Sequence, residues 1–166
     1  MSISAAERHS SGGLVFEEYL ETGFNYRMTD IQAAVTSVQL GKLASIVERR
    51  RRLAAHYHDA FAEVPGVHPV VDPSYGETNF QSFWMLLDAS FPVRRNQLME
   101  SFAEAGISTR RGIMAAHLEP ACARFATHPL PNTERLTRDS VILPLYHDLD
   151  ESDQARVVEV VLDAVR

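Results

Sequence analysis

Apolar residues between positions 29 and 63 recur every three or four residues, as they do on one face of a helix. Thr29 and Gln32 have the spacing of a capping box, which typically begins a helix. Pro65 and Gly66 follow the last apolar position, and such a pair typically ends one. The pattern predicts one long helix over 29–63, with Gly41 as the position where it would bend.

The two halves of this predicted helix differ in charge. Residues 28–47 include only two charged side chains, Asp30 and Lys42, so we expect this half to be covered on most sides. Residues 49–52 are four arginines, which point all around a helix because successive residues turn by about 100°. At least one should therefore contact protein or a partner. A phosphate-binding role is one interpretation of this run, and a solvated, partly ion-paired helix face is the simpler one.

Shorter elements follow the long helix. The pattern predicts strands at 67–71, 80–87, 107–113 and 141–145, and helices at 93–105, 132–139 and 150–166. Gly106 should end the first of these helices, Asn132 should cap the second, and residues 117–131 should be irregular because they contain three prolines. This order predicts an α+β fold, in which helices pack on a small, mostly antiparallel sheet.

Composition narrows the function classes. The 166 residues are 45% hydrophobic and 23% charged, which is usual for a globular protein that can bury a core without disulfides. A net charge of −6 argues against binding to nucleic acid or to an anionic membrane. No signal peptide and no run of about 18 apolar residues is present, so we expect a cytoplasmic protein. One cysteine, Cys122, excludes an internal disulfide and a cysteine-cluster metal site.

The sequence contains no nucleotide-binding, hydrolase or zinc-protease motif. His56 and His58 diverge by about 200° on a helix, so they cannot share a metal ion. Cys122 with His117 or His128 could mimic a catalytic Cys/His pair, but nothing in the sequence marks this cysteine as activated. Motifs alone therefore indicate only an α+β domain.

A resemblance changes this picture. Residues 23–34, GFNYRMTDIQAA, closely resemble a signature of the DegT/DnrJ/EryC1/StrS family of pyridoxal-phosphate-dependent sugar aminotransferases. The later segments QL (39–40), RRR (49–51), TRRGIMAAHLEPA (109–121) and LPLY (143–146) resemble the family in the same order. The resemblance covers essentially the whole chain.

The resemblance implies the C-terminal small domain of a fold-type-I aminotransferase. Residues 1–28 would be a loop and connector, and 29–166 the small domain with its long leading helix. Family members are about twice as long, and a large N-terminal domain carries the lysine that binds pyridoxal 5′-phosphate (PLP). We expect this large domain to be absent here, since Lys42 lies after the signature and cannot replace that lysine. The chain alone is therefore predicted to be inactive.

The resemblance also implies roles for three residues. Asn25 matches an asparagine that reaches the cofactor phosphate of the neighbouring subunit, Arg27 matches a position near the substrate or its carboxylate, and His117 matches a histidine that approaches the sugar in some members. Simpler alternatives are a turn residue for Asn25, an ion pair with a glutamate of 17–21 for Arg27, and a structural loop histidine for His117. No catalytic residue and no metal ligand is expected in this chain.

The implied parent reaction moves an amino group from an amino-acid donor, usually glutamate, onto a nucleotide-linked keto-sugar, as in amino-sugar biosynthesis. The implied partners are a second copy in a homodimer or a lysine-bearing N-terminal half, and neither nucleic acid nor a membrane. The chain would supply dimer interface, cofactor-phosphate contacts and substrate contacts. The alternative is a non-catalytic dimerisation or docking module derived from this family.

Overall fold

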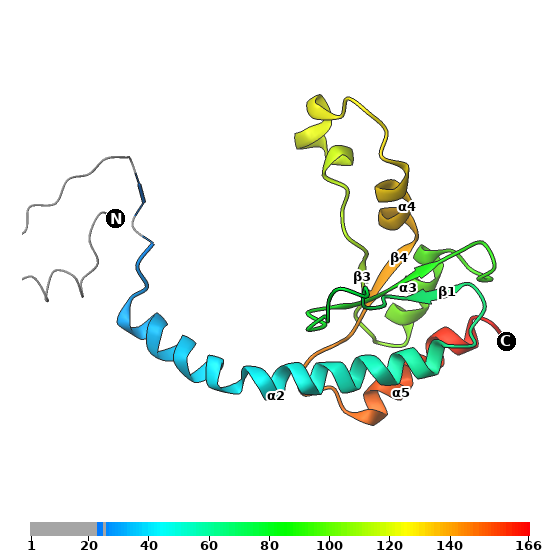
Figure 1. The fold of residues 1–166 in the computed structure, drawn as a ribbon. Helices are drawn as coiled ribbons and strands as arrows, with labels where there is room; N and C mark the ends of the chain where they lie inside the picture. Colours follow the sequence, from blue (N-terminus) through cyan, green and yellow to red (C-terminus); the bar gives the residue numbers. More distant parts are fainter. Residues whose placement is uncertain (1–22, 25) are drawn as a thin grey trace, which may run out of the picture. The chain divides into compact units, whose positions relative to one another are not determined.

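The computed structural model describes residues 23, 24 and 26–166, and the chain divides into two units, Met1–Gly41 and Lys42–Arg166. Helix α2, Asp30–Phe61, passes from the first unit into the second (Figure 1). Its bounds lie within two residues of the predicted helix. The predicted division into a connector of 1–28 and a small domain of 29–166 stays a prediction.

The first unit contains the beginning of α2. The Thr29 N–H donates to Gln32 Oε1 at 3.0 Å, and the Gln32 N–H donates to Thr29 Oγ1 at 3.3 Å. These reciprocal bonds confirm the predicted capping box. The large apolar side chains here are exposed, namely Phe24, Tyr26, Met28, Ile31, Val35, Val38 and Leu40.

The second unit is built on a four-stranded sheet. The strands are β1 (Val67–Pro69), β2 (Phe83–Leu87), β3 (Arg110–Arg111) and β4 (Ser140–Leu143), in the order β1-β2-β4-β3. Every neighbouring pair is antiparallel, which confirms the predicted sheet. Phe83 lies opposite Leu143 and Met85 opposite Val141, so buried residues of the central strands β2 and β4 face each other in the register.

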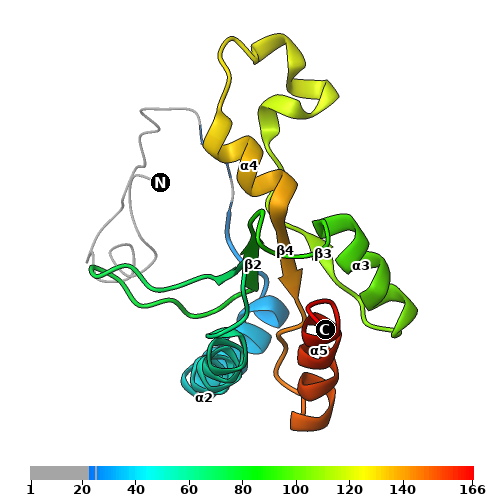
Figure 2. The same cartoon turned by 90° about the vertical axis from the view of Figure 1, so that its right-hand side faces the viewer.

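Helices cover one face of this sheet. Along β2, Phe83, Met85 and Leu87 are buried while the side chains between them are half-buried. Their partners in the core come from α2, α3 (Arg95–Glu104) and α5 (Glu151–Asp163), namely Leu53, Tyr57, Phe61, Leu98, Phe102, Val157 and Val161. Figure 2 shows α5 between α2 and α3. The predicted α+β fold with helices packed on a small sheet is confirmed.

The connection from β3 to β4 forms a protrusion, residues 112–139 (yellow to gold in Figure 1). It contains the 3-10 helices η1 (Ala116–Leu118) and η2 (Pro120–Phe125) and helix α4 (Pro131–Asp139). The prediction that 117–131 is irregular was therefore wrong for much of its length. Asn132 is not the cap of α4, because the helix begins at Pro131, whose fixed φ suits the first helical position.

All four predicted strands are shorter than expected, and β4 ends at Leu143 rather than at residue 145. Strand β2 begins at Phe83 rather than at residue 80, because Phe80 has a φ of 47° and interrupts the extended backbone. Strand β1 stops at Pro69. Strand β3 has two residues, since the Ile107 N–H still bonds back to Phe102 O at the end of α3. None of the helices in the described part of the chain is long and apolar enough to cross a membrane.

Candidate functional site

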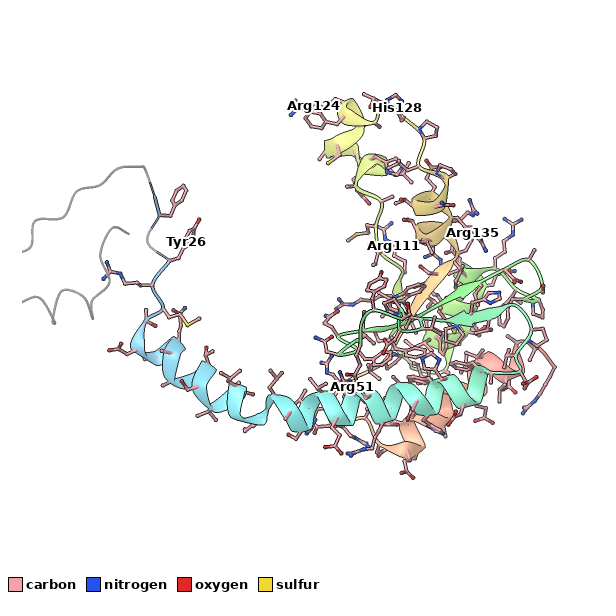
Figure 3. The ribbon with its side chains drawn as sticks, viewed as in Figure 1. Tyr26, Arg51, Arg111, Arg124, His128 and Arg135 are labelled. Carbon is pink, nitrogen blue, oxygen red and sulfur yellow. The ribbon has the colours of Figure 1, made fainter. Side chains whose placement is uncertain are left out.

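Two arginines of the 49–52 run hold the backbone of the β1–β2 connection. Arg50 Nη1 donates to the carbonyl oxygens of Phe80 at 2.9 Å and Gln81 at 2.8 Å. Arg51 (labelled in Figure 3) donates to the carbonyl of Thr78 at 3.1 Å. Charge-assisted bonds to carbonyl oxygens fix α2 against this connection.

The other two arginines also have partners within the chain. Arg49 Nη2 donates to the Leu149 carbonyl at 2.6 Å, and Arg52 pairs with Glu48 one turn earlier at 2.6 Å. The expectation that at least one arginine contacts protein is confirmed. Since three of the four guanidinium groups bind carbonyl oxygens of the chain itself, their geometry supports a structural role rather than a phosphate site.

His117 in η1 forms the best-defined polar contact of the protrusion. Its Nε2 lies 3.2 Å from Glu134 Oε1 of α4, and the two side chains are 14% and 35% exposed. The Leu130 N–H donates to the same oxygen at 3.0 Å. These two hydrogen bonds, from the Leu130 N–H first and then from His117, hold the pKa of the Glu134 carboxyl below its usual range. Glu134 is therefore a carboxylate that already accepts two hydrogen bonds.

A second contact joins the same two segments. Thr137 Oγ1 donates to the Ile113 carbonyl at 2.8 Å. Glu134 and Thr137 are three residues apart and therefore lie on one face of α4. Glu119, just after η1, also pairs with Arg111 of β3 at 3.4 Å. The segment that carries His117 is thus attached to α4 at two points and to the sheet at a third.

The base of the protrusion is closely packed around Ser140. The Gly112 N–H donates to the Ser140 carbonyl at 2.9 Å, and a Cβ on Gly112 would lie 1.6 Å from Ser140 Oγ. Arg95 Nη1 donates to the same carbonyl at 3.3 Å. Burial lowers the pKa of the Arg95 guanidinium, and the nearby charge of Arg111 lowers it further. The positively charged side chains of Arg95 and Arg111 therefore lie close together at the base of the protrusion.

An open hollow lies beside this base, between the beginning of α3 and α4. Its arginines are Arg94, Arg95, Arg135 and Arg138, and its carboxylates are Asp88 and Asp139. Arg138 is paired with Asp139 at 2.7 Å, so part of the positive charge is neutralised. Figure 3 labels Arg111 and Arg135 in this part of the molecule.

The three residues implied by the resemblance belong to different parts of the chain, and each is described by itself. Arg27 precedes α2 in the first unit and is exposed, whereas His117 belongs to the second unit. Asn25 lies outside the described residues. Their implied roles stay predictions, and the arrangement around His117 is the part that the structure describes in detail.

Glu134 was missed in the sequence. It is separated from His117 by 17 residues, and the turns of η1 and η2 bring the two together. The only local signal is an acidic residue in the first turn of a predicted helix, which is usually explained by the helix dipole. The bond from the Leu130 N–H is a capping bond of this kind, but an acidic residue in a first helical turn does not indicate the histidine.

The alternative Cys/His pairing receives no support. Among the residues that the structure describes, no hydrogen bond joins Cys122 to His117 or His128. Within this same part of the chain, no three histidine, cysteine or carboxylate side chains are grouped so that they could hold a metal ion. His56 instead contacts the buried Gln154 of α5, with 2.9 Å between Nδ1 and Oε1.

Comparison with solved structures places this geometry among known proteins. The chain is similar to S. venezuelae DesV in complex with a ketimine intermediate, with 28% identity, a TM-score of 0.79, and coverage of 95% of this chain and 42% of that one. It is similar to the aminotransferase TlmJ from Streptoalloteichus hindustanus, with 27% identity, a TM-score of 0.75, and coverage of 89% and 39%. The chain thus spans about two fifths of the length of these proteins.

A more distant structure shares the fold. E. coli GDP-4-keto-6-deoxy-D-mannose-3-dehydratase with bound hydrated PLP is 21% identical, with a TM-score of 0.75 and coverage of 87% of this chain and 38% of that one. The model of the DegT/DnrJ/EryC1/StrS aminotransferase family matches residues 4–162. The resemblance noted in the sequence is therefore confirmed over nearly the whole chain, and this protein belongs to the DegT/DnrJ/EryC1/StrS aminotransferase family.

Proposed function

We propose that this chain is the C-terminal part of a PLP-dependent aminotransferase that acts on nucleotide-linked keto-sugars. The observation that carries the proposal is the family match over residues 4–162. Relatives named as an aminotransferase and as a protein bound to a ketimine intermediate support it. Because the chain spans 42% or less of the length of these relatives, the proposed activity is that of the whole enzyme and not of these 166 residues alone.

The residues of this chain do not fit the covalent attachment of PLP. The sequence contains 15 arginines and a single lysine, Lys42, which is exposed within α2. PLP, when bound, would supply an electron sink for amino transfer, and a lysine would hold the resting cofactor. That lysine would come from the N-terminal part of the enzyme, and the present chain would contribute only non-covalent contacts.

Those contacts are assigned to three residues. The amide of Asn25 would donate a hydrogen bond to the cofactor phosphate of the neighbouring subunit. The guanidinium of Arg27 suits bidentate binding of a substrate carboxylate or phosphate. His117 would form part of the wall around the sugar.

The exposed apolar side chains near the start of α2 support the proposal that a partner protein covers this part of the helix. Ile31 is 78% exposed, Val35 58% and Val38 60%, although they recur at helical spacing. An apolar surface of this kind usually marks an interface. A second copy of the chain, or a lysine-bearing N-terminal half, is the proposed partner. The rival proposal, a non-catalytic docking module, needs the same surface but no cofactor.

Co-expression with the lysine-bearing N-terminal half of a family member tests this function. We expect amino transfer from glutamate to a nucleotide-linked keto-sugar only when both parts are present. Asn25→Ala should then weaken PLP binding by roughly 10- to 150-fold, the loss of one charge-assisted hydrogen bond. A stable complex of the two parts that shows no turnover, and whose PLP binding is unchanged by Asn25→Ala, would favour the docking module.

A further inference from the structure

The protrusion presents His117 in a defined way. The ring is mostly buried, and its Nε2 faces Glu134 Oε1 at 3.2 Å. Within the part of the chain that the structure describes, Nδ1 has no hydrogen-bond partner. One ring nitrogen is therefore used by the protein, and the other is left for a ligand.

Glu134 decides which nitrogen carries the proton. The Leu130 N–H bond at 3.0 Å lowers the pKa of the Glu134 carboxyl, and the ionised carboxylate oxygens can only accept. A neutral imidazole facing such an oxygen must place its N–H on Nε2, which makes Nδ1 an acceptor. An acceptor at Nδ1 suits a hydroxyl group, which can donate to it.

We propose that Glu134 is a positioning residue that fixes the ring and the tautomer of His117, so that Nδ1 accepts a hydrogen bond from a hydroxyl of the sugar substrate. The inference rests on the proposed function, because it assigns His117 to the substrate wall of that enzyme. To that assignment it adds Glu134 as the positioning residue, the Nε2–H tautomer of His117, and a sugar hydroxyl as the group that Nδ1 binds.

The contacts around Glu134 separate this role from simple helix capping. Capping requires only the Leu130 N–H bond, at 3.0 Å. Positioning requires the contact with His117 as well, and both bonds use the same oxygen, Oε1. Thr137 provides a matched control, because its bond to Ile113 at 2.8 Å attaches the same segment to the same face of α4 without contacting His117.

The tautomer is measured first, in the chain itself, by nitrogen-15 NMR with the His117 signal assigned from a His117→Asn variant. We expect His117 to be protonated on Nε2 in the wild type and in Thr137→Val. In Glu134→Ala the two tautomers should become mixed. In Glu134→Gln, which keeps an acceptor at Oε1, the Nε2–H form should be largely restored. A wild-type population that Glu134→Ala leaves unchanged would overturn the proposal.

The ligand contact is measured in the two-part enzyme. Glu134→Ala should raise KM for the nucleotide-linked sugar about tenfold with little change in kcat, which corresponds to one hydrogen bond. In His117→Ala, the same Glu134→Ala change should have no further effect. An equal additional loss there would show that Glu134 acts independently of His117, and would overturn the proposal. If the wild-type enzyme shows no turnover, the proposed function fails, while the tautomer populations still decide the positioning role.

Discussion

Arg50 in α2 donates a hydrogen bond to the carbonyl oxygen of Phe80, a buried residue with a φ of 47° that ends the β1–β2 connection. A bulky side chain in the left-handed region is strained, so the surrounding structure must hold it there. The guanidinium does so from 30 residues away, and its second bond, to Gln81, fixes the next peptide as well. Strand β2 therefore begins at Phe83, just after the two residues whose carbonyl oxygens Arg50 binds.

Arg50→Met should destabilise the fold by about 1.5–3 kcal/mol, because the hydrogen bonds of a charged donor to two carbonyl oxygens are lost, and the one at Phe80 is partly buried. Arg52→Met is the matched control. Arg52 only pairs with Glu48 on an exposed helix surface, and such pairs contribute about 0.3–0.5 kcal/mol. Urea unfolding of both variants measures the difference, and equal losses would contradict the anchoring role of Arg50.

Two glycines with positive φ should differ in their tolerance of a side chain. Gly66 has a φ of 77°, and a Cβ there would lie 2.2 Å from the backbone nitrogen of Phe91. Gly106 has a φ of 73°, but a Cβ there would meet nothing within 4 Å. Gly106→Ala should cost about 1–2 kcal/mol for its conformation alone. Gly66→Ala should cost about 2–5 kcal/mol, since steric overlap is added.

Thermal or urea unfolding of the two alanine variants measures this order. Gly66→Ala with a stability equal to that of Gly106→Ala would mean that Phe91 moves away freely. The close approach of the two backbones would then not restrict position 66.

Asp88 should make stability depend on acidic pH. Hydrogen bonds from His68 first and then from Ser90 lower the pKa of its carboxyl from 3.8 to about 2. Since the folded-state pKa is the lower one, the ionised carboxylate stabilises the fold above pH 3.8, and this contribution is lost as the pH falls toward 2. Asp88→Asn should therefore be less stable than the wild type near neutral pH, with the two converging at about pH 2.

Chemical unfolding at a series of pH values measures this convergence. His68→Gln should show a smaller pH dependence than the wild type, because the main hydrogen bond to the carboxylate is changed. A constant difference between Asp88→Asn and the wild type at every pH would exclude the ionised Asp88 carboxylate as the cause.

Local chemistry made much of the fold predictable. The capping box of Thr29 and Gln32 and the positive φ of Gly106 depend on residues within one or two turns, and the structure contains both. The α+β fold could be predicted for the same reason, because the apolar pattern within each short segment indicates whether it forms a helix or a strand. The start of β2 could not be predicted, because it depends on Arg50, 30 residues before Phe80.

The site was less predictable than the fold. The resemblance indicated His117, but its partner Glu134 becomes visible only when the protrusion folds and brings residues 17 positions apart into contact. The arginine run shows the reverse case, in which the sequence suggests a site that the structure does not support. A run of arginines is compatible with phosphate binding. Only the folded structure shows that Arg49, Arg50 and Arg51 bind carbonyl oxygens of the chain itself, which indicates a structural role.

The exposed apolar face of α2 should make the chain associate with itself when no partner covers it. Replacing Ile31, Val35 and Val38 with serine should reduce both this association and the binding of a dye for apolar surfaces. The stability of the second unit should change little, because these side chains are more than half exposed and belong to the first unit.

Val157→Ser is the matched control. Val157 is 2% exposed in the core of the second unit, so its replacement should lower stability without reducing self-association. Light scattering over a wide concentration range and unfolding curves separate the two effects. A wild-type chain that is monomeric at every concentration and binds no dye would show that this face needs no cover, and would count against both a second copy and a lysine-bearing half as its partner.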